Sequence, residues 1–206
     1  HALFPGWGRG FSPYSPSSRT FLNAAMGDPA LLGLPPLPQR AGGDLIDWPG
    51  AMPQRQADLR AVFAGLPPAL RQRIRAGSAA EGAALLRHAL YDALDCRFRA
   101  QGADGWQMWP AALHDPDGTA AQTFARENAE EVEFHLFSQW LAREGLAMVQ
   151  ARAKAAGMKI GLVADLAVGV HTGGSDSWAM RDALLQGLTI GAPPDPLGPL
   201  GQNWML

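Results

Sequence analysis

The chain has 206 residues, of which 47% are hydrophobic and 17% are charged, with a formal net charge of −2. This composition supplies enough apolar surface for a core and excludes a chain that is disordered throughout. The 17 Lys and Arg residues are balanced by 19 Asp and Glu without a basic cluster, which argues against nucleic acid as a partner. No apolar run approaches the roughly 18 residues of a membrane-spanning helix, so a membrane is not an expected partner either. The single cysteine, Cys96, excludes an intramolecular disulfide, and the predicted location is cytoplasmic.

The two ends of the sequence have the composition of structured regions. Residue 1 is His1 rather than Met, and an apolar segment is already in progress there. Residues 201–206 carry neither a helix cap nor a polar tail. We therefore expect the chain to be a piece of a larger fold.

Residues 1–53 are rich in Gly, Pro and Ser. Each proline fixes φ near −65° and pushes the residue before it towards extended geometry, while serines favour turns. Residues 10–19, which combine prolines with serines, therefore predict a stiff and irregular loop.

A helical pattern begins near residue 54. Apolar residues at every fourth position from Leu86 to Phe98 predict an amphipathic helix of roughly 20 residues. A second long helix is predicted over 128–156, with acidic residues in its first turn and Gly157 just beyond its end. Shorter helices are predicted at 57–64, 68–75 and 119–127.

The pattern changes after Gly157. Residues 158–170 are a nearly continuous apolar run directly after a helix, which is typical of a buried strand in a parallel sheet. A Gly-rich loop at 172–176, a short helix over 178–186 and a Pro/Gly-rich loop to the end are predicted to follow. A parallel sheet needs several strands, and this is the one convincing strand, so the pattern again predicts an incomplete chain.

Asp165 interrupts the apolar run and is the first candidate site residue. A carboxylate in an apolar strand must be paired or hydrogen-bonded. At the carboxyl end of a barrel strand such a residue faces the active site. The same placement suits a carboxylate that caps a loop by accepting backbone N–H groups, and both interpretations stay open.

His171 and Asp176 lie together in the Gly-rich loop. The pair could be a base with its orienting acid, as in a hydrolase, or two metal ligands. A third ligand at suitable spacing is missing from the sequence, so a metal site is disfavoured. The other histidines considered are expected on helix surfaces or in packing: His88, His114 and His135.

Four aromatic residues fall in predicted loops: Trp7, Tyr14, Trp178 and Trp204. Flat aromatic faces beside polar groups suit a sugar ring, whose C–H bonds stack on them. The alternative is that each ring covers apolar scaffold, the commoner role of a single Trp. The remaining tryptophans are expected in the core: Trp106, Trp109 and Trp140.

Four ordered motifs resemble one family, the 4-α-glucanotransferases, also called amylomaltases or disproportionating enzymes. The first is Ser12-Pro-Tyr14-Ser-Pro-Ser-Ser-Arg19 followed by Leu22-Asn23. The others are Trp109-Pro110 together with 134–140, the run 159–170 followed by 174–178, and 191–195 leading to 201–204. The likeness covers about residues 1–25 and 106–206.

The resemblance implies an α/β fold, part of a (β/α)8 TIM-type barrel with a large inserted helical subdomain. The expected division is a loop region after the first barrel strand at 1–53, a helical insert at 54–127, and a barrel helix, strand and active-site loops at 128–206. The implied reaction transfers α-1,4-glucan segments between maltooligosaccharides through a covalent glycosyl-enzyme. No metal or organic cofactor is implied.

The resemblance also implies site residues. Tyr14 falls on a position that lines the donor sugar, and 193–201 matches a loop that closes over the sugar. The predicted substrate-binding set is Tyr14, Asp165, Ser175, Asp176, Asp195, Gln202 and Trp204. The family's nucleophilic Asp, in an Arg-x-Asp, its acid/base Glu on the next strand and a second Asp do not map onto residues 1–206. No catalytic residue is therefore predicted in this chain.

One departure from the family pattern and one alternative function complete the predictions. Pro196-Leu197 stands where some relatives carry an aromatic pair, so acceptor stacking is expected to be weaker or supplied elsewhere. The alternative function is a non-catalytic glucan-binding or protein-interaction module, which would keep the loop aromatics and need no acid/base pair.

Overall fold

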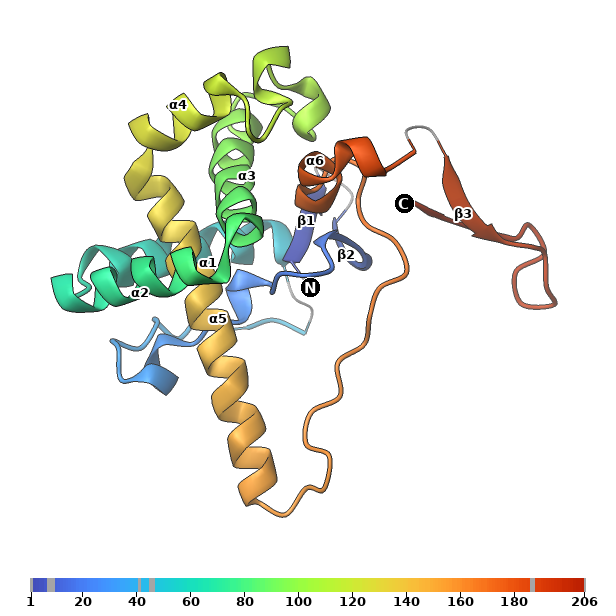
Figure 1. Ribbon diagram of the computed structural model, residues 1–206. Helices are drawn as coiled ribbons and strands as arrows, with labels where there is room; N and C mark the ends of the chain where they lie inside the picture. The colour runs from blue at the N-terminus through green and yellow to red at the C-terminus, as the bar shows by residue number, and fades with distance from the viewer. Residues whose placement is uncertain (1, 7–9, 41, 45–46, 186–187, 206) are drawn as a thin grey trace. The chain divides into compact units, whose positions relative to one another are not determined.

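The computed structural model describes residues 2–6, 10–40, 42–44, 47–185 and 188–205. The chain forms two compact units, whose elements are labelled in Figure 1. The first unit comprises His1–Phe21, Leu90–Glu127 and Leu166–Leu206, and the second comprises Leu22–Ala89 and Asn128–Asp165. Each unit is built from segments far apart in the sequence.

Among the described residues, α1, α2, α3 and α5 are long helices and the other regular elements are short. The α-helices are α1 (Trp48–Ala64), α2 (Pro68–Glu81), α3 (Ala83–Arg99), α4 (Thr119–Glu127), α5 (Ala129–Ala155) and α6 (Ser175–Ala179). Single 3-10 turns occur at Ala24–Met26, Pro29–Leu32, Trp106–Met108, Ala111–Leu113 and Arg181–Ala183. The strands are β1 (Ala2–Gly6), β2 (Gly10–Ser18), β3 (Thr189–Ala192) and β4 (Gln202–Met205).

The core of the second unit lies where α1 and α2 pack against α5. The ring of Phe63 meets Phe134 edge-on at a centroid distance of 5.8 Å and Phe137 at 5.6 Å. Such aromatic pairs contribute about 0.5–1.5 kcal/mol beyond the area they bury. The buried apolar cluster consists of Leu59, Val62, Phe63, Leu66, Ile74, Phe134, Phe137 and Leu141.

The periodic helix predictions are confirmed for α3, α4 and α5, and Gly157 takes the left-handed conformation (φ 94°) just beyond α5. The prediction for α1 began nine residues too late. Asp47 caps this helix by accepting from the Gly50 N–H, and Pro53 sits inside it. A proline near a helix start removes one donor, so the segment 48–56 lacks the usual helical signature.

The strand predicted over 158–170 is wrong, because these residues are described throughout and form no strand. Several of the apolar side chains are exposed, Val163 to 83%. The backbone of this segment bonds to α5 instead: Gln150 accepts from the Leu162 N–H at 2.7 Å and donates to the Ile160 carbonyl at 3.2 Å. A strand of this type is stable only between neighbouring strands, and an apolar pattern cannot supply them.

The loop predicted for residues 10–19 is also wrong in part, because 10–18 form β2, antiparallel to β1. The register is irregular and passes from the pair Pro5–Phe11 to the pair Leu3–Pro16. Pro13 and Pro16 cannot donate to a ladder, but a two-stranded ribbon has free edges that tolerate them.

The C-terminal loop contains a second antiparallel hairpin that was not predicted, with Ile190 opposite Trp204 and Ala192 opposite Gln202. The helix predicted over 178–186 begins earlier and is shorter: α6 ends at Ala179 and a 3-10 turn follows. Gln186 and Trp7 lie outside the described residues.

The core of the first unit is aromatic. Trp178 is completely buried, and its ring lies 5.9 Å from Tyr91 and 6.0 Å from Trp109. The Trp178 indole N–H donates to the Leu113 carbonyl at 2.9 Å. The expectation that Trp178 offers a sugar-stacking face is therefore wrong in this structure, whereas Trp106 and Trp109 are buried as expected.

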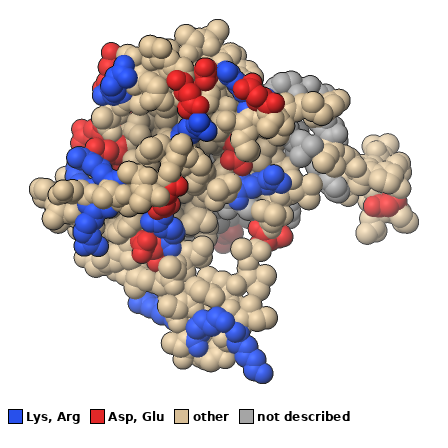
Figure 2. Space-filling model, viewed as in Figure 1, with Lys and Arg blue, Asp and Glu red and all other residues tan. Residues whose placement is uncertain are grey.

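Cationic and anionic side chains are mixed over most of the face drawn in Figure 2. Some of these charges pair across helices, such as Arg75 with Glu133 at 2.7 Å. Within the described ranges, no helix combines the length and apolarity needed to cross a membrane.

Candidate functional site

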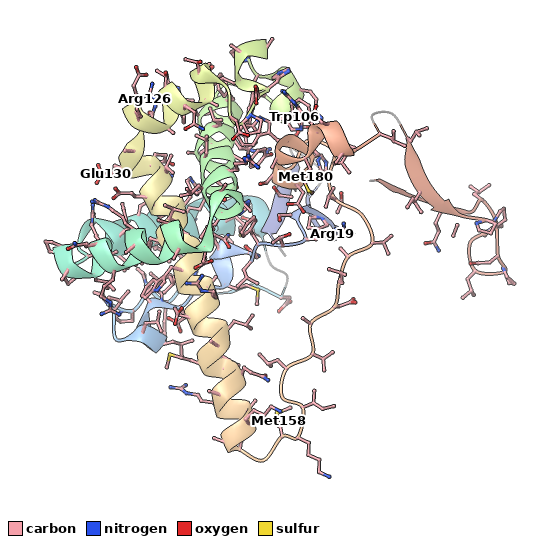
Figure 3. All side chains as sticks on the ribbon, viewed as in Figure 1. Arg19, Trp106, Arg126, Glu130, Met158 and Met180 are labelled. Atoms are coloured by element: carbon pink, nitrogen blue, oxygen red, sulfur yellow. The ribbon has the colours of Figure 1, made fainter. Side chains whose placement is uncertain are left out.

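The candidate site of the first unit is built where the end of β2 meets the start of α6. The Ser17 hydroxyl oxygen accepts from the Ser175 N–H at 2.9 Å, and the Asp176 carboxylate accepts from the Arg19 N–H at 2.8 Å. A third hydrogen bond joins the same two segments: the His171 N–H donates to the Pro16 carbonyl at 2.8 Å. Arg19, which follows β2 directly, is labelled in Figure 3. Three hydrogen bonds thus join two segments more than 150 residues apart in the sequence.

The two backbones approach each other closely at Gly174. A Cβ placed there would lie 2.7 Å from the Ser17 Cα and 2.8 Å from the Ser17 carbonyl oxygen. The φ of Gly174 is −85°, which any residue adopts, so contact rather than conformation requires glycine.

The carbonyls of the loop before α6 are held by side chains of the segment 91–107. The Thr172 carbonyl accepts from the Trp106 indole at 3.1 Å and from the Gln107 amide at 2.7 Å. The Gly173 carbonyl accepts from the Tyr91 hydroxyl at 2.5 Å. Burial, assisted by the charge of Asp95, raises the pKa of Tyr91 well above its usual value, so this phenol stays a donor.

His171 and Asp176, considered together as a base and its orienting acid, each bond to backbone. The Nδ1 atom of His171 accepts from the Gly173 N–H at 3.0 Å. Burial lowers the pKa of His171 to about 4, while the nearby charge of Asp104 opposes that shift. The imidazole is therefore neutral near pH 7.

Asp195 and Gln202 belong to the hairpin formed by β3 and β4. The Asp195 carboxylate accepts from the N–H groups of Leu197 at 2.8 Å and Gly198 at 2.6 Å, which shapes the turn. Gln202 is exposed at the start of β4, and Trp204 follows two residues later in the same strand. Leu197, where the resemblance implies an aromatic residue in some relatives, is almost fully exposed.

The remaining predicted site residues, Tyr14 and Asp165, lie in different segments of the chain. Tyr14 is in the middle of β2, where the structure describes its backbone but not its side chain, as for Trp204. Asp165 is exposed in the irregular segment after α5, so the premise of a carboxylate buried in a strand is wrong. The structure thus joins the β2 segment that carries Tyr14 to Ser175 and Asp176.

The second unit has its own buried polar contacts, centred on α5. The side-chain amide of Gln139 accepts from the Leu22 N–H at 3.1 Å and donates to the Leu22 carbonyl at 2.8 Å. Its nitrogen also lies 3.3 Å from Nε2 of His88, which must then be the acceptor. His88 is buried, in agreement with its expected packing role.

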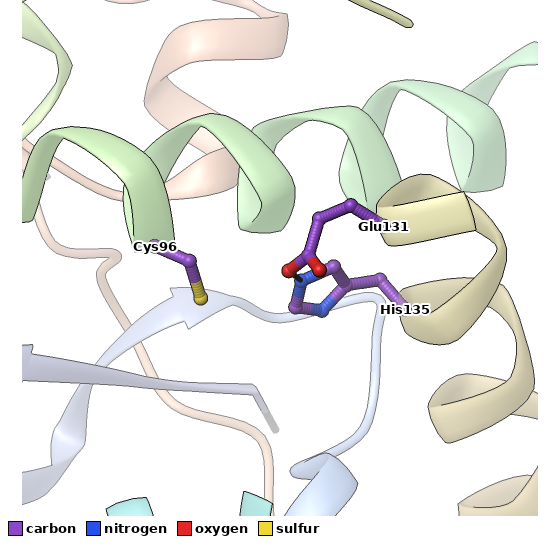
Figure 4. A group of neighbouring side chains, drawn as sticks. All are labelled: Cys96, Glu131 and His135. Carbon is purple, nitrogen blue, oxygen red and sulfur yellow. Dashed lines mark hydrogen bonds and ion pairs between the residues drawn. The ribbon is translucent and has the colours of Figure 1, made fainter. Parts of the chain in front are cut away.

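Glu131 and His135 lie on α5, N-terminal to Gln139. Nε2 of His135 is 3.1 Å from the Glu131 carboxylate, as drawn in Figure 4. Arg60 also donates two bonds of 2.5 Å to the Glu131 carboxylate. Burial by itself raises the pKa of Glu131, but the hydrogen bonds from His135 and Arg60 outweigh it and lower the pKa to about 2. His135 is buried here as a structural partner.

The sequence was compared with models of known protein families. The model of a family described as 4-alpha-glucanotransferase matches residues 1–206. The chain belongs to the 4-alpha-glucanotransferase family. A 4-alpha-glucanotransferase from Mycobacterium tuberculosis is 38% identical over 209 residues, which cover 94% of this chain and 28% of that protein. The chain thus spans less than a third of the length of this relative.

Other members of the 4-alpha-glucanotransferase family are also similar over most of this chain. The enzyme of that name from Thermus thermophilus is 30% identical across 96% of this chain and 41% of its own length. The crystal structure of an amylomaltase from Corynebacterium glutamicum matches all of this chain and 29% of its own, with a TM-score of 0.67 and 28% identity. An amylomaltase from Streptococcus agalactiae shares the fold at a TM-score of 0.74 over 94% of this chain and 42% of its own, with 20% identity.

Several residues that build this part of the 4-alpha-glucanotransferase chain were not singled out from the sequence: Ser17, Gly174, Tyr91 and Gln139. Ser17, Gly174 and Gln139 lie inside three of the four motifs, so their positions carried a signal but their contacts did not. Tyr91 lies on a helix whose apolar periodicity drew attention to its neighbours instead.

Proposed function

We propose that this chain supplies the sugar-binding segments of a 4-α-glucanotransferase. The reaction moves an α-1,4-glucan segment from a donor maltooligosaccharide, through a covalent glycosyl-enzyme, to the 4-hydroxyl of an acceptor sugar. The observation that carries the proposal is the family match across residues 1–206, supported by 38% identity to a mycobacterial enzyme. The nucleophilic and acid/base carboxylates are proposed to lie outside these residues.

Within this proposal, the chain is part of a (β/α)8 barrel in a cytoplasmic enzyme. The proposed division is 1–53, 54–127 and 128–206, as the sequence predicted. The similarity in fold to two amylomaltases supports the barrel assignment.

The proposed sugar-binding residues fall into two groups. Tyr14 and Asp165 are assigned to the donor side, with Ser175 and Asp176 associated with the segment that carries Tyr14. Asp195, Gln202 and Trp204 are assigned to a hairpin that covers the sugar. The turn shaped by Asp195 supports this second group, since a loop that covers a sugar needs a defined tip.

The test is maltotriose disproportionation by the protein expressed from its natural reading frame. Transfer breaks one glycosidic bond and forms another, so two maltotrioses give one glucose and one maltopentaose at a constant number of reducing ends. Hydrolysis raises that number, and a binding module leaves maltotriose unchanged. Constant reducing ends with accumulating glucose and longer products are expected.

Tyr14→Ala is expected to lower kcat/KM for this transfer severely, because a stacking face at the donor sugar would be lost. Exchange of the exposed Asp182 for Ala in the same protein is the control and leaves the rate unchanged. Transfer by Tyr14→Ala at the wild-type rate would remove Tyr14 from the donor side.

A further inference from the structure

We infer that Asp176 and Ser17 are positioning residues for Tyr14, an inference that rests on the proposed donor-side role of Tyr14. The two side chains form a reciprocal brace between the end of β2 and the start of α6. Each side chain accepts a hydrogen bond from a backbone N–H of the opposite segment: Ser17 from Ser175, and Asp176 from Arg19.

The brace is buried and tight. Asp176 is 6% exposed and Ser17 is 3% exposed. A buried carboxylate that accepts from a backbone N–H makes a stronger hydrogen bond than a neutral acceptor does. At Gly174 the two backbones touch so closely that a methyl group would not fit. The relative position of the two segments is therefore fixed by charge, hydrogen bonding and contact together.

The brace holds the part of β2 that carries Tyr14. Between the pairs Pro5–Phe11 and Leu3–Pro16 the strand register is irregular, and Tyr14 lies in this stretch. Pro13 and Pro16 flank it with fixed φ angles, which reduces the backbone rotation that could absorb a displacement of Ser17 before it reaches Tyr14. The end of β2 thus depends on α6 for the position of Tyr14.

The burial of Asp176 and Ser175 also argues against direct contact between these residues and a sugar. The carboxylate of Asp176 faces backbone of its own unit, and Ser175 is 1% exposed, so a sugar hydroxyl would have to displace an internal hydrogen bond to reach either residue. Their contribution to a sugar site is therefore exerted through the β2 segment.

The test is a double-mutant cycle in the protein from its natural reading frame, assayed for maltotriose transfer. Asp176→Ala is expected to lower kcat/KM about tenfold or more, given the strength of hydrogen bonds to charged groups. Asp176→Asn, whose Oδ1 still accepts from Arg19, recovers most of the rate. Asp182→Ala, an exposed aspartate in the following 3-10 turn, stays at the wild-type rate.

The decisive variant is Tyr14→Ala combined with Asp176→Ala. If Asp176 acts through Tyr14, the double variant is no slower than Tyr14→Ala alone. Losses that multiply would show that Asp176 acts independently of Tyr14, and would overturn the inference. If Asp176→Ala does not fold, Ser17→Ala, which removes the other half of the brace, completes the same cycle with a smaller perturbation.

Amide hydrogen exchange tests the brace without an activity assay. Exchange of the Arg19 N–H is expected to be faster in Asp176→Ala than in Asp182→Ala, and unchanged exchange would overturn the brace. An inactive wild-type protein would instead overturn the proposed function, and the Tyr14 assignment with it, while the exchange result still stands. The two failures are thus distinguishable.

Discussion

Gln139→Met offers the most quantitative test of the packing of the second unit. Gln139 is 6% exposed on α5 and makes three contacts: with the N–H of Leu22, with its carbonyl, and with Nε2 of His88. Methionine has nearly the same length and shape but neither donates nor accepts strongly. The substitution therefore removes the hydrogen bonds without opening a large cavity.

The expected loss of stability follows from these contacts. Each intramolecular hydrogen bond contributes about 0.5–1.5 kcal/mol, and a buried group left without its partner adds to that loss. Three contacts give a decrease of about 2–4 kcal/mol in the free energy of unfolding. For a chain of this size, each kcal/mol lowers Tm by about 2–4 °C, so Tm should fall by roughly 4–16 °C.

The assay is urea unfolding followed by circular dichroism, with Gln150→Met as the matched control. Gln150 lies on the same helix and also bonds an N–H and a carbonyl, those of Leu162 and Ile160, but these two hydrogen bonds are exposed to solvent. Water can replace its bonds, so a loss below about 1 kcal/mol is expected. Equal losses for the two variants would refute the reasoning that burial makes the Gln139 contacts important.

Two further changes test close contact and charge. Gly174→Ala should destabilise the protein by about 1–3 kcal/mol in urea unfolding, because the added methyl meets the Ser17 backbone, whereas Gly77→Ala in open space on α2 should stabilise it by about 0.5–1 kcal/mol. A neutral result at position 174 would show that the two segments are not in contact. The pKa of Glu131 is lowered from 4.5 to about 2, so its stabilising contribution is present above about pH 4.5 and is lost as the pH falls towards 2. Glu131→Gln should flatten this part of the curve of stability against pH, and Glu130→Gln, at a largely exposed position, should leave it unchanged; identical curves for wild type and Glu131→Gln would contradict the assignment.

The elements that the sequence predicted well are those whose hydrogen bonds are local. The boundaries of α5 follow from its apolar period, its acidic first turn and Gly157, all of which lie within the helix or next to it. The strand predicted at 158–170 failed because a strand is defined by its neighbours. Its carbonyls and N–H groups near Ile160 and Leu162 bond to a helix side chain instead.

The site was predictable in its parts but not in its connections. Ser175 and Asp176 were singled out by their place in the Gly-rich loop and by the resemblance, but nothing in their local sequence indicates that they meet β2. The partner of Asp176 is the N–H of Arg19, which is 157 residues away in the chain. Trp178 shows the same limit: a loop aromatic suggested a sugar face, and its burial against Tyr91 and Trp109 depends on segments distant in sequence.

The central proposal is that the catalytic carboxylates of the transfer reaction lie outside these 206 residues. The most direct measurement is to read the natural reading frame past Leu206. The account predicts that the frame continues into a strand ending in Arg-x-Asp, followed by a Glu on the next strand. A stop codon directly after Leu206 would contradict it, because transfer through a glycosyl-enzyme would then lack both its nucleophile and its acid/base.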